Sequence, residues 1–208
     1  MDARWVNVID VEATCWERSS KKNISDIIEI GLTVFDSQNF EITTTDSIIV
    51  KPAHSSVSEF CTSLTTLTPE FVDENGITFQ DATNILSSRF DSKRRLFASW
   101  GEYDRKIFEK QFQLYRVDSI FGPEHLNIKA LFAHCLGMEK QVGMAEALKI
   151  LTLPLDGTHH RGSDDSRNIT KILQYLLTSI RSDSSMRKAC ESFSTSPAIR
   201  AWLLSPSQ

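Results

Sequence analysis

An apolar stretch near the start of the sequence ends in two carboxylates, and this combination constrains the fold more than any other feature. Residues Val6 to Val11 are mostly apolar and β-branched, which is typical of a buried strand. Because strand side chains alternate between faces, Asp10 and Glu12 leave on the same face, about 6–7 Å apart at the backbone. Two such carboxylates can hold a divalent cation. The alternative is that one acid simply ends the strand in a turn, and for a lone D-x-E this alternative is favoured.

Length and composition predict one soluble domain. With 208 residues, 40% of them hydrophobic, the chain can bury one good core. We expect a single domain over residues 1–208, with a core of about 5–180 and a helical extension of about 183–208. The net charge of −4 argues against binding of polyanions by bulk charge, so any contact with nucleic acid must be local or carried by metal.

The cysteines and the apolar runs predict a cytoplasmic protein without a membrane partner. The four cysteines lie far apart and form no C-x-x-C pair, which is typical of reduced, mostly buried thiols in a cytosolic protein. No basic-then-apolar leader and no apolar run near 18 residues is visible.

Periodicity and turn residues predict a mixed sheet covered by helices. After a polar loop at 17–25, two strands joined by a hairpin are expected, and residues 55–68 are expected to be a connecting stretch. A long amphipathic helix is expected from Asp165 to Ile180, and Ile199, Trp202 and Leu203 suit a last short helix docked on the core. The remaining expected elements are strands at 27–35, 40–50 and 96–100 and helices at 78–90, 103–115, 128–135 and 144–151.

Four acids and a histidine stand at the ends of these expected elements: Asp10, Glu12, Asp104, His160 and Asp165. Taken singly, Asp104 and Asp165 are adequately explained as helix-start carboxylates, and a loop histidine is usually just solvated. Taken together, hard oxygen ligands on separate elements are what two Mg²⁺ or Mn²⁺ ions need for in-line phosphoryl displacement.

Four segments resemble, in order, the motifs of DEDDh 3′→5′ exonucleases. They are Asp10 to Trp16, Ile27 to Gly31, Ser99 to Asp104 and His160 to Ile169. The opening D-x-E-A-T-C-W is similar to the enhancer-of-RNA-interference, or histone-mRNA 3′-exonuclease, branch. Two departures are mild: Val11 stands where phenylalanine is common, and the histidine is doubled by His159. The H-x-x-x-x-D spacing selects His160 over His159 and Asp165 over Asp164.

The resemblance implies a fold and a catalytic chemistry. The fold would be the α/β ribonuclease-H-like exonuclease fold, a mixed five-stranded sheet flanked by helices with the first strand central. Asp10, Glu12, Asp104 and Asp165 would hold two divalent cations, Mg²⁺ with Mn²⁺ able to substitute, one orienting the attacking water and the other stabilising the leaving 3′ oxygen. His160 would accept the proton of that water, and the products would be nucleoside 5′-monophosphates.

The resemblance also suggests substrate contacts. The backbone after the D-x-E and an apolar wedge would receive the terminal nucleotide, which indicates Ala13, Thr14 and Leu64. Leu64 suits core packing equally well. Trp16 suits either base stacking or a buried anchor. Among the basic residues we favour Arg161, beside His160, as a phosphate contact; Lys21, Lys22, Arg94 and Arg95 are more simply solvated.

The sequence therefore predicts a metal-dependent 3′→5′ exonuclease acting on single-stranded RNA 3′ ends or short overhangs. The same chemistry on single-stranded DNA is an alternative, since no residue visibly reads a 2′-hydroxyl. A catalytically inactive nucleic-acid-binding or scaffold protein on this fold is a second alternative. Retention of all five polar residues argues against it, because no fold requires five converging polar groups. The sequence names no protein partner.

Overall fold

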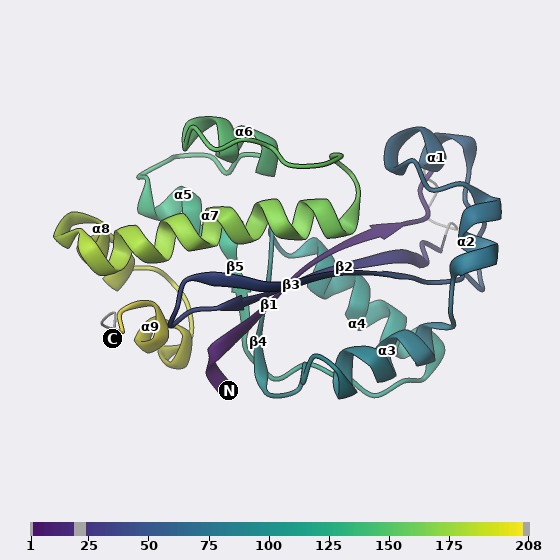
Figure 1. Ribbon diagram of the computed structural model, residues 1–208, viewed down its shortest axis with the longest axis horizontal. Coiled ribbons are helices and arrows are strands. Elements are labelled where there is room, and N and C mark those ends of the chain that lie inside the picture. Colours follow the sequence, from purple (N-terminus) through teal and green to yellow (C-terminus); the bar gives the residue numbers. More distant parts are fainter. Residues whose placement is uncertain (1, 19–23, 206–208) are drawn as a thin grey trace.

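A computed structural model describes residues 2–18 and 24–205, and a five-stranded mixed sheet forms its centre (Figure 1). The strand order is β3-β2-β1-β4-β5, so the strand that carries the D-x-E is central, as the resemblance implied. The predicted α/β class and mixed sheet are confirmed. The strands are β1 Asp2–Ala13, β2 Ile27–Asp36, β3 Glu41–Ile49, β4 Arg95–Ser99 and β5 His125–Asn127.

The sheet is antiparallel on one side of β1 and parallel on the other. β1, β2 and β3 pair antiparallel, and the carboxylate of Asp36 accepts the backbone N–H groups of Gln38 and Asn39 in the predicted hairpin turn. β4 and β5 run parallel to β1. The sequence reading located no strand at β5, because three residues are too few to show a period of two.

Helices cover the ends and both faces of the sheet. They are α1 Glu59–Thr65, α2 Pro69–Asn75, α3 Phe79–Ser88, α4 Tyr103–Tyr115, α5 Ile128–Cys135, α6 Met144–Ile150, α7 Gly162–Ser182, α8 Ser184–Glu191 and α9 Pro197–Leu203.

The stretch at 55–68 is more than the connection that we expected, because it contains α1. Its hydroxyl residues are helix caps: Ser58 accepts the N–H of Cys61 at the start of α1, and Thr68 accepts that of Phe71 at the start of α2. A cap and a loop look alike in sequence, because both use serine and threonine. The long helix α7 also begins earlier than expected, three residues before Asp165.

The alternation of β1 divides the core between two groups of helices; in Figure 1, α5 to α8 lie above the sheet, α3 and α4 lie below it, and α9 lies below the strands beside the C-terminus. Val6 and Val8 pack on the side of α5 to α9, whereas Ile9 and Val11 pack on the side of α3 and α4. Ile199, Trp202 and Leu203 are buried in the first of these clusters, as expected. In the part of the chain that the structure describes, no helix is long and apolar enough to cross a membrane.

The N-terminus of α7 meets the sheet at an unusually close contact between two glycines. A Cβ built on Gly31 of β2 would lie 1.8 Å from the carbonyl carbon of Gly162, the first residue of α7. Beside them, the buried carboxylate of Glu29 accepts the backbone N–H of Gly162 and the Nε–H of Arg161, each at 3.1 Å. Only glycine permits this approach, so the helix starts directly over β1 and β2.

We expect Gly31→Ala to lower the free energy of unfolding by about 2–3 kcal/mol, because an added methyl must push the helix from the sheet. Gly143→Ser is the matched control, since a Cβ there meets nothing within 4 Å and serine suits its N-cap position. Urea unfolding of both variants measures the difference. Equal stability of the two would contradict a tight contact at Gly31.

Candidate active site

The two acids of β1 project beyond the end of the neighbouring strand. β4 pairs with β1 only as far as Val8 and ends at Ser99. Past that point the backbone N–H of Val11 donates to Oδ1 of Asp104, in the first turn of α4, at 3.1 Å. The end of β4 therefore lets an acid from α4 lie beside Asp10 and Glu12.

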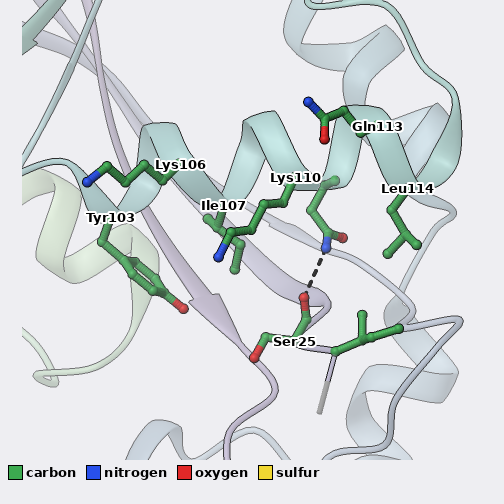
Figure 2. A pocket seen from close by; sticks show the side chains of 9 residues that line it. Ser25, Tyr103, Lys106, Ile107, Lys110, Gln113 and Leu114 are labelled. Carbon is green, nitrogen blue, oxygen red and sulfur yellow. Dashed lines mark hydrogen bonds between the residues drawn. The ribbon is translucent and has the colours of Figure 1, made fainter. Parts of the chain in front are cut away.

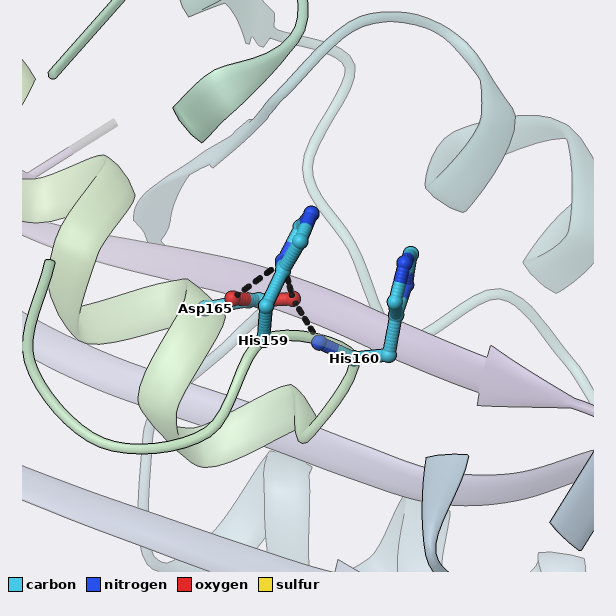
Figure 3. Close-up of side chains that lie close together, drawn as sticks. All are labelled: His159, His160 and Asp165. Carbon is cyan, nitrogen blue, oxygen red and sulfur yellow. Dashed lines mark hydrogen bonds and ion pairs between the residues drawn. The ribbon is translucent and has the colours of Figure 1, made fainter. Parts of the chain in front are cut away.

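The start of α7 and the loop before it bring Asp165 and two histidines to the same place (Figure 3). Nδ1 of His159 lies 3.1 and 3.0 Å from the two carboxylate oxygens of Asp165, and the backbone N–H of His160 donates to Oδ2 at 2.8 Å. The two imidazole rings stack, with centroids 4.0 Å apart. His160 has a φ of 66°, a left-handed conformation that histidine adopts more readily than most residues.

All five predicted polar residues line one cavity of about 320 Å³. One carboxylate oxygen each from Asp10, Glu12 and Asp165 lies within 4.8 Å of the other two. One ligand atom each from His159, His160 and Asp165 meets the same limit. The cavity lining consists of Asp10, Val11, Glu12, Trp100, Tyr103, Asp104, Gly143, Met144, His159, His160 and Asp165.

Burial and mutual repulsion disturb the ionisation of the acids. Burial, followed by the neighbouring carboxylates, raises the pKa of Asp10 well above its usual value and that of Glu12 to about 8. Burial raises the pKa of Asp104 to about 6 against hydrogen bonds that lower it, and it also raises the pKa of Asp165. The cavity thus offers several carboxylate oxygens with little positive charge beside them. This is the kind of ligand set that a hard divalent cation prefers.

The environment of His160 favours a neutral ring. Burial, and then the neighbouring His159, lower the pKa of His160, while Asp165 opposes them. Among the described residues, the ring nitrogens of His160 have no hydrogen bond, whereas Nδ1 of His159 is engaged by Asp165.

None of the five predicted substrate-binding residues lines this cavity. Ala13 is buried in the core under the sheet, and its carbonyl accepts the thiol of Cys61 at 3.6 Å. The Thr14 hydroxyl lies 2.8 Å from the Ser55 hydroxyl and accepts the backbone N–H of Asp26 at 2.9 Å.

The other candidate contacts are either exposed or already paired. Leu64 is 37% exposed on α1, and Trp16 is half-buried. The guanidinium of Arg161 is paired with Glu29, a partner that sequence reasoning missed because it lies 132 residues away. Arg95 lies over the Trp5 ring, and Arg94 pairs with Asp91 at 3.7 Å. Lys21 and Lys22 lie outside the described residues.

Sequence reasoning also missed Tyr103. It appeared there only as the start of a helix, yet its side chain is 58% exposed and lines the cavity beside Asp104. Its position directly before the candidate ligand Asp104, at the start of a helix, was the signal in the sequence that could have indicated a place in the cavity.

A buried carboxylate joins the start of β2 to the segment after β3 and to α4. Asp26, fully buried, accepts the His54 backbone N–H, the Ser55 hydroxyl and the Tyr115 hydroxyl at 2.7 to 2.8 Å. Despite burial, these hydrogen bonds lower the pKa of Asp26. Asp26 is thus a satisfied structural acid, whereas the pKa values of the cavity acids are all raised.

Comparison with known proteins identifies the family. The exonuclease family model, RNase_T, matches residues 7–173. The chain belongs to this exonuclease family. The predicted membership is therefore confirmed, and the clustered acids of the cavity agree with a family whose members use divalent cations.

Individual relatives extend this result. Rat 3′-5′ exoribonuclease 1 is 29% identical over 182 residues, which cover 83% of this chain and 53% of the relative. The chain thus spans about half the length of the curated relatives that it matches. The nuclease domain of 3′hExo, a DEDDh family member solved bound to rAMP, superposes with a TM-score of 0.75 at 27% identity and covers 84% of this chain and 92% of that one. A 3′-exonuclease solved in recognition of the histone mRNA stem-loop superposes with a TM-score of 0.74 at 26% identity. The match covers 83% of this chain and 63% of that one.

We expect Asp10→Asn to raise the melting temperature in EDTA. Among the described residues the Asp10 side chain has no hydrogen bond to lose. Because burial in the fold raises its pKa, its ionisation opposes folding at neutral pH, and this cost disappears with the charge. Added Mg²⁺ should stabilise the wild type more than the variant.

Asp26→Asn is the control for this experiment. It removes a carboxylate that accepts several hydrogen bonds, and we expect it to cost about 1–3 kcal/mol in the same buffer. A fall in stability for both variants would show that Asp10 is also a satisfied structural acid.

Proposed function

We propose that the chain is a metal-dependent 3′→5′ exonuclease that degrades RNA from its 3′ end. The observation that carries the proposal is the convergence of four carboxylates and a histidine pair, from β1, α4 and the start of α7, on one open cavity. No structural role requires four converging carboxylates in one place, whereas phosphodiester hydrolysis by bound cations does.

Asp10, Glu12, Asp104 and Asp165 would hold two divalent cations, Mg²⁺ or Mn²⁺. When bound, the cations would supply the positive charge that orients the attacking water and stabilises the leaving 3′ oxygen. The imidazole of His160 accepts the proton of that water, because its ring nitrogens are free of hydrogen bonds within the described residues. His159 holds Asp165 in place instead.

For the terminal nucleotide, the exposed face of Tyr103 offers a surface for base stacking at the edge of the cavity. Leu64 and Trp16 are further candidate base contacts. The side chains of Ala13 and Thr14 are not available, because one is in the core and the hydroxyl of the other is bonded internally. Their backbone is also engaged in part, since the Thr14 N–H donates to the Asp26 carbonyl and the Ala13 carbonyl accepts the Cys61 thiol. Arg161 would reach a phosphate only in competition with Glu29.

RNA is the favoured substrate because the curated relatives are named exoribonucleases, and of the similar structures one is bound to rAMP and another shows recognition of the histone mRNA stem-loop. We propose single-stranded 3′ ends or short overhangs as the form that is bound. Cytoplasmic localisation stays a prediction, based on four cysteines that are all free thiols.

With Mg²⁺ or Mn²⁺, we expect single-stranded RNA labelled at its 5′ end to shorten one nucleotide at a time, and a 3′-phosphate to slow this degradation. Matched DNA and a circular RNA complete the panel. Internal cuts in the circular RNA would exclude an exonuclease, and faster degradation of the DNA would overturn the preference for RNA.

The role of each cavity residue can be separated by kinetics. We expect His160→Ala to lower turnover by roughly 10²–10⁴-fold, to keep cation affinity and to recover partly at higher pH. Asp165→Ala should weaken cation binding, so raised Mn²⁺ should recover part of its activity.

His159→Ala is the matched control for the histidine assignment. Its ring stacks on His160 and contacts Asp165, so we expect a smaller loss of turnover than for His160→Ala. For all three variants, the rate of hydrolysis is measured as a function of pH and of Mn²⁺ concentration. A near-normal His160→Ala with a severely impaired His159→Ala would reverse the assignment.

A further inference from the structure

A second and larger cavity, of about 620 Å³, lies along one face of α4 (Figure 2). We call it the α4 groove. Tyr103 lines both this groove and the catalytic cavity, so the two adjoin at that residue. The groove is lined by Ile24, Ser25, Tyr103, Lys106, Ile107, Lys110, Gln111, Gln113 and Leu114.

Two lysines give the α4 groove a positive edge. Lys106 and Lys110 are exposed and stand four residues, or about 6 Å, apart along the helix. Within residues 2–18 and 24–205, neither lysine forms an ion pair. Arg105 of the same helix, by contrast, is neutralised by Glu102 and Glu109 at 2.9 and 3.0 Å. In a chain of net charge −4, two unpaired cations beside a cavity indicate an anionic ligand.

The floor and walls of the groove are apolar and held in place. Ile107 is buried, while Leu114 is half-buried and Ile24 is 44% exposed. Nε2 of Gln111 donates to the carbonyl of Ser25 at 2.9 Å and ties the two walls together. The groove thus combines apolar surface, which suits the bases of a single strand, with two lysines, which suit its phosphates.

We propose that the α4 groove binds the nucleotides immediately 5′ of the terminal nucleotide in a single-stranded substrate. This inference rests on the proposed function, because the terminal nucleotide must occupy the catalytic cavity for the strand to continue past Tyr103. Lys106 and Lys110 contact successive phosphates, and Ile24 and Leu114 contact bases. Contacts of this kind bind the strand without reading its sequence.

The test compares Lys106→Glu/Lys110→Glu with Lys188→Glu, which reverses an exposed lysine of α8. Two measurements are made on each protein. The first is binding of a labelled single strand of about ten nucleotides with Ca²⁺ in place of Mg²⁺, at several salt concentrations. The second is kcat/KM with Mg²⁺ on that strand and on a dinucleotide.

We expect the double variant to bind the long strand about ten-fold more weakly at low salt, and the slope of log Kd against log salt to fall by about 1.4, two contacts of about 0.7 each. Its loss of kcat/KM should be about ten-fold greater on the long strand than on the dinucleotide. Lys188→Glu should match the wild type in both measurements.

The two proposals fail in different ways. If the double variant binds the long strand with the same affinity as Lys188→Glu, while the wild type degrades RNA, the proposed role of the α4 groove is wrong and the exonuclease proposal stands. A wild type that binds the strand through these lysines but hydrolyses neither substrate overturns the proposed function alone.

Discussion

The contact between the start of α7 and the sheet is the constraint on which the site depends. Gly31 and Gly162 let the helix approach the strands without an intervening side chain, and Glu29 satisfies the first helical N–H while neutralising Arg161. Asp165 follows one turn later and therefore lies over Asp10 and Glu12. A helix held further away would leave these carboxylates separated, and the cavity would lack its fourth acid.

The same contact concentrates negative charge that the surrounding residues compensate only in part. Arg161 lowers the pKa of Glu12, but its guanidinium is paired with Glu29 at 3.1 Å, and burial and the neighbouring carboxylates still raise the pKa of Asp10 and Glu12. Asp26 shows the contrast within one chain, since a comparably buried acid with enough donors is stable as the carboxylate. The protein thus stores electrostatic repulsion that a bound divalent cation would relieve.

The pattern of apolar residues predicted those helices and strands in which the repeat extends over enough positions to be recognised. β1, β2 and α7 repeat their apolar residues over many positions, so they were recognised, and motif spacing selected the five polar residues that share a cavity. β5 has three residues and α1 begins among hydroxyl residues, so neither has a distinctive pattern. Contacts over long separation were beyond sequence reasoning. Glu29 forms an ion pair with Arg161, and the Thr14 hydroxyl is hydrogen-bonded to Ser55 and to the backbone N–H of Asp26. Neither pairing leaves a signal in the local sequence.

Whether a cation relieves this repulsion can be measured by calorimetric titration of Mn²⁺ into the metal-free protein near pH 7, in two buffers of different ionisation enthalpy. Burial and the neighbouring carboxylates raise the pKa of Glu12 to about 8, so the metal-free site holds protons that a cation must displace. We expect Mn²⁺ to bind with release of protons, and both the binding and the proton release to be lost in Asp10→Asn. Binding without proton release, or no binding at all, would contradict this expectation.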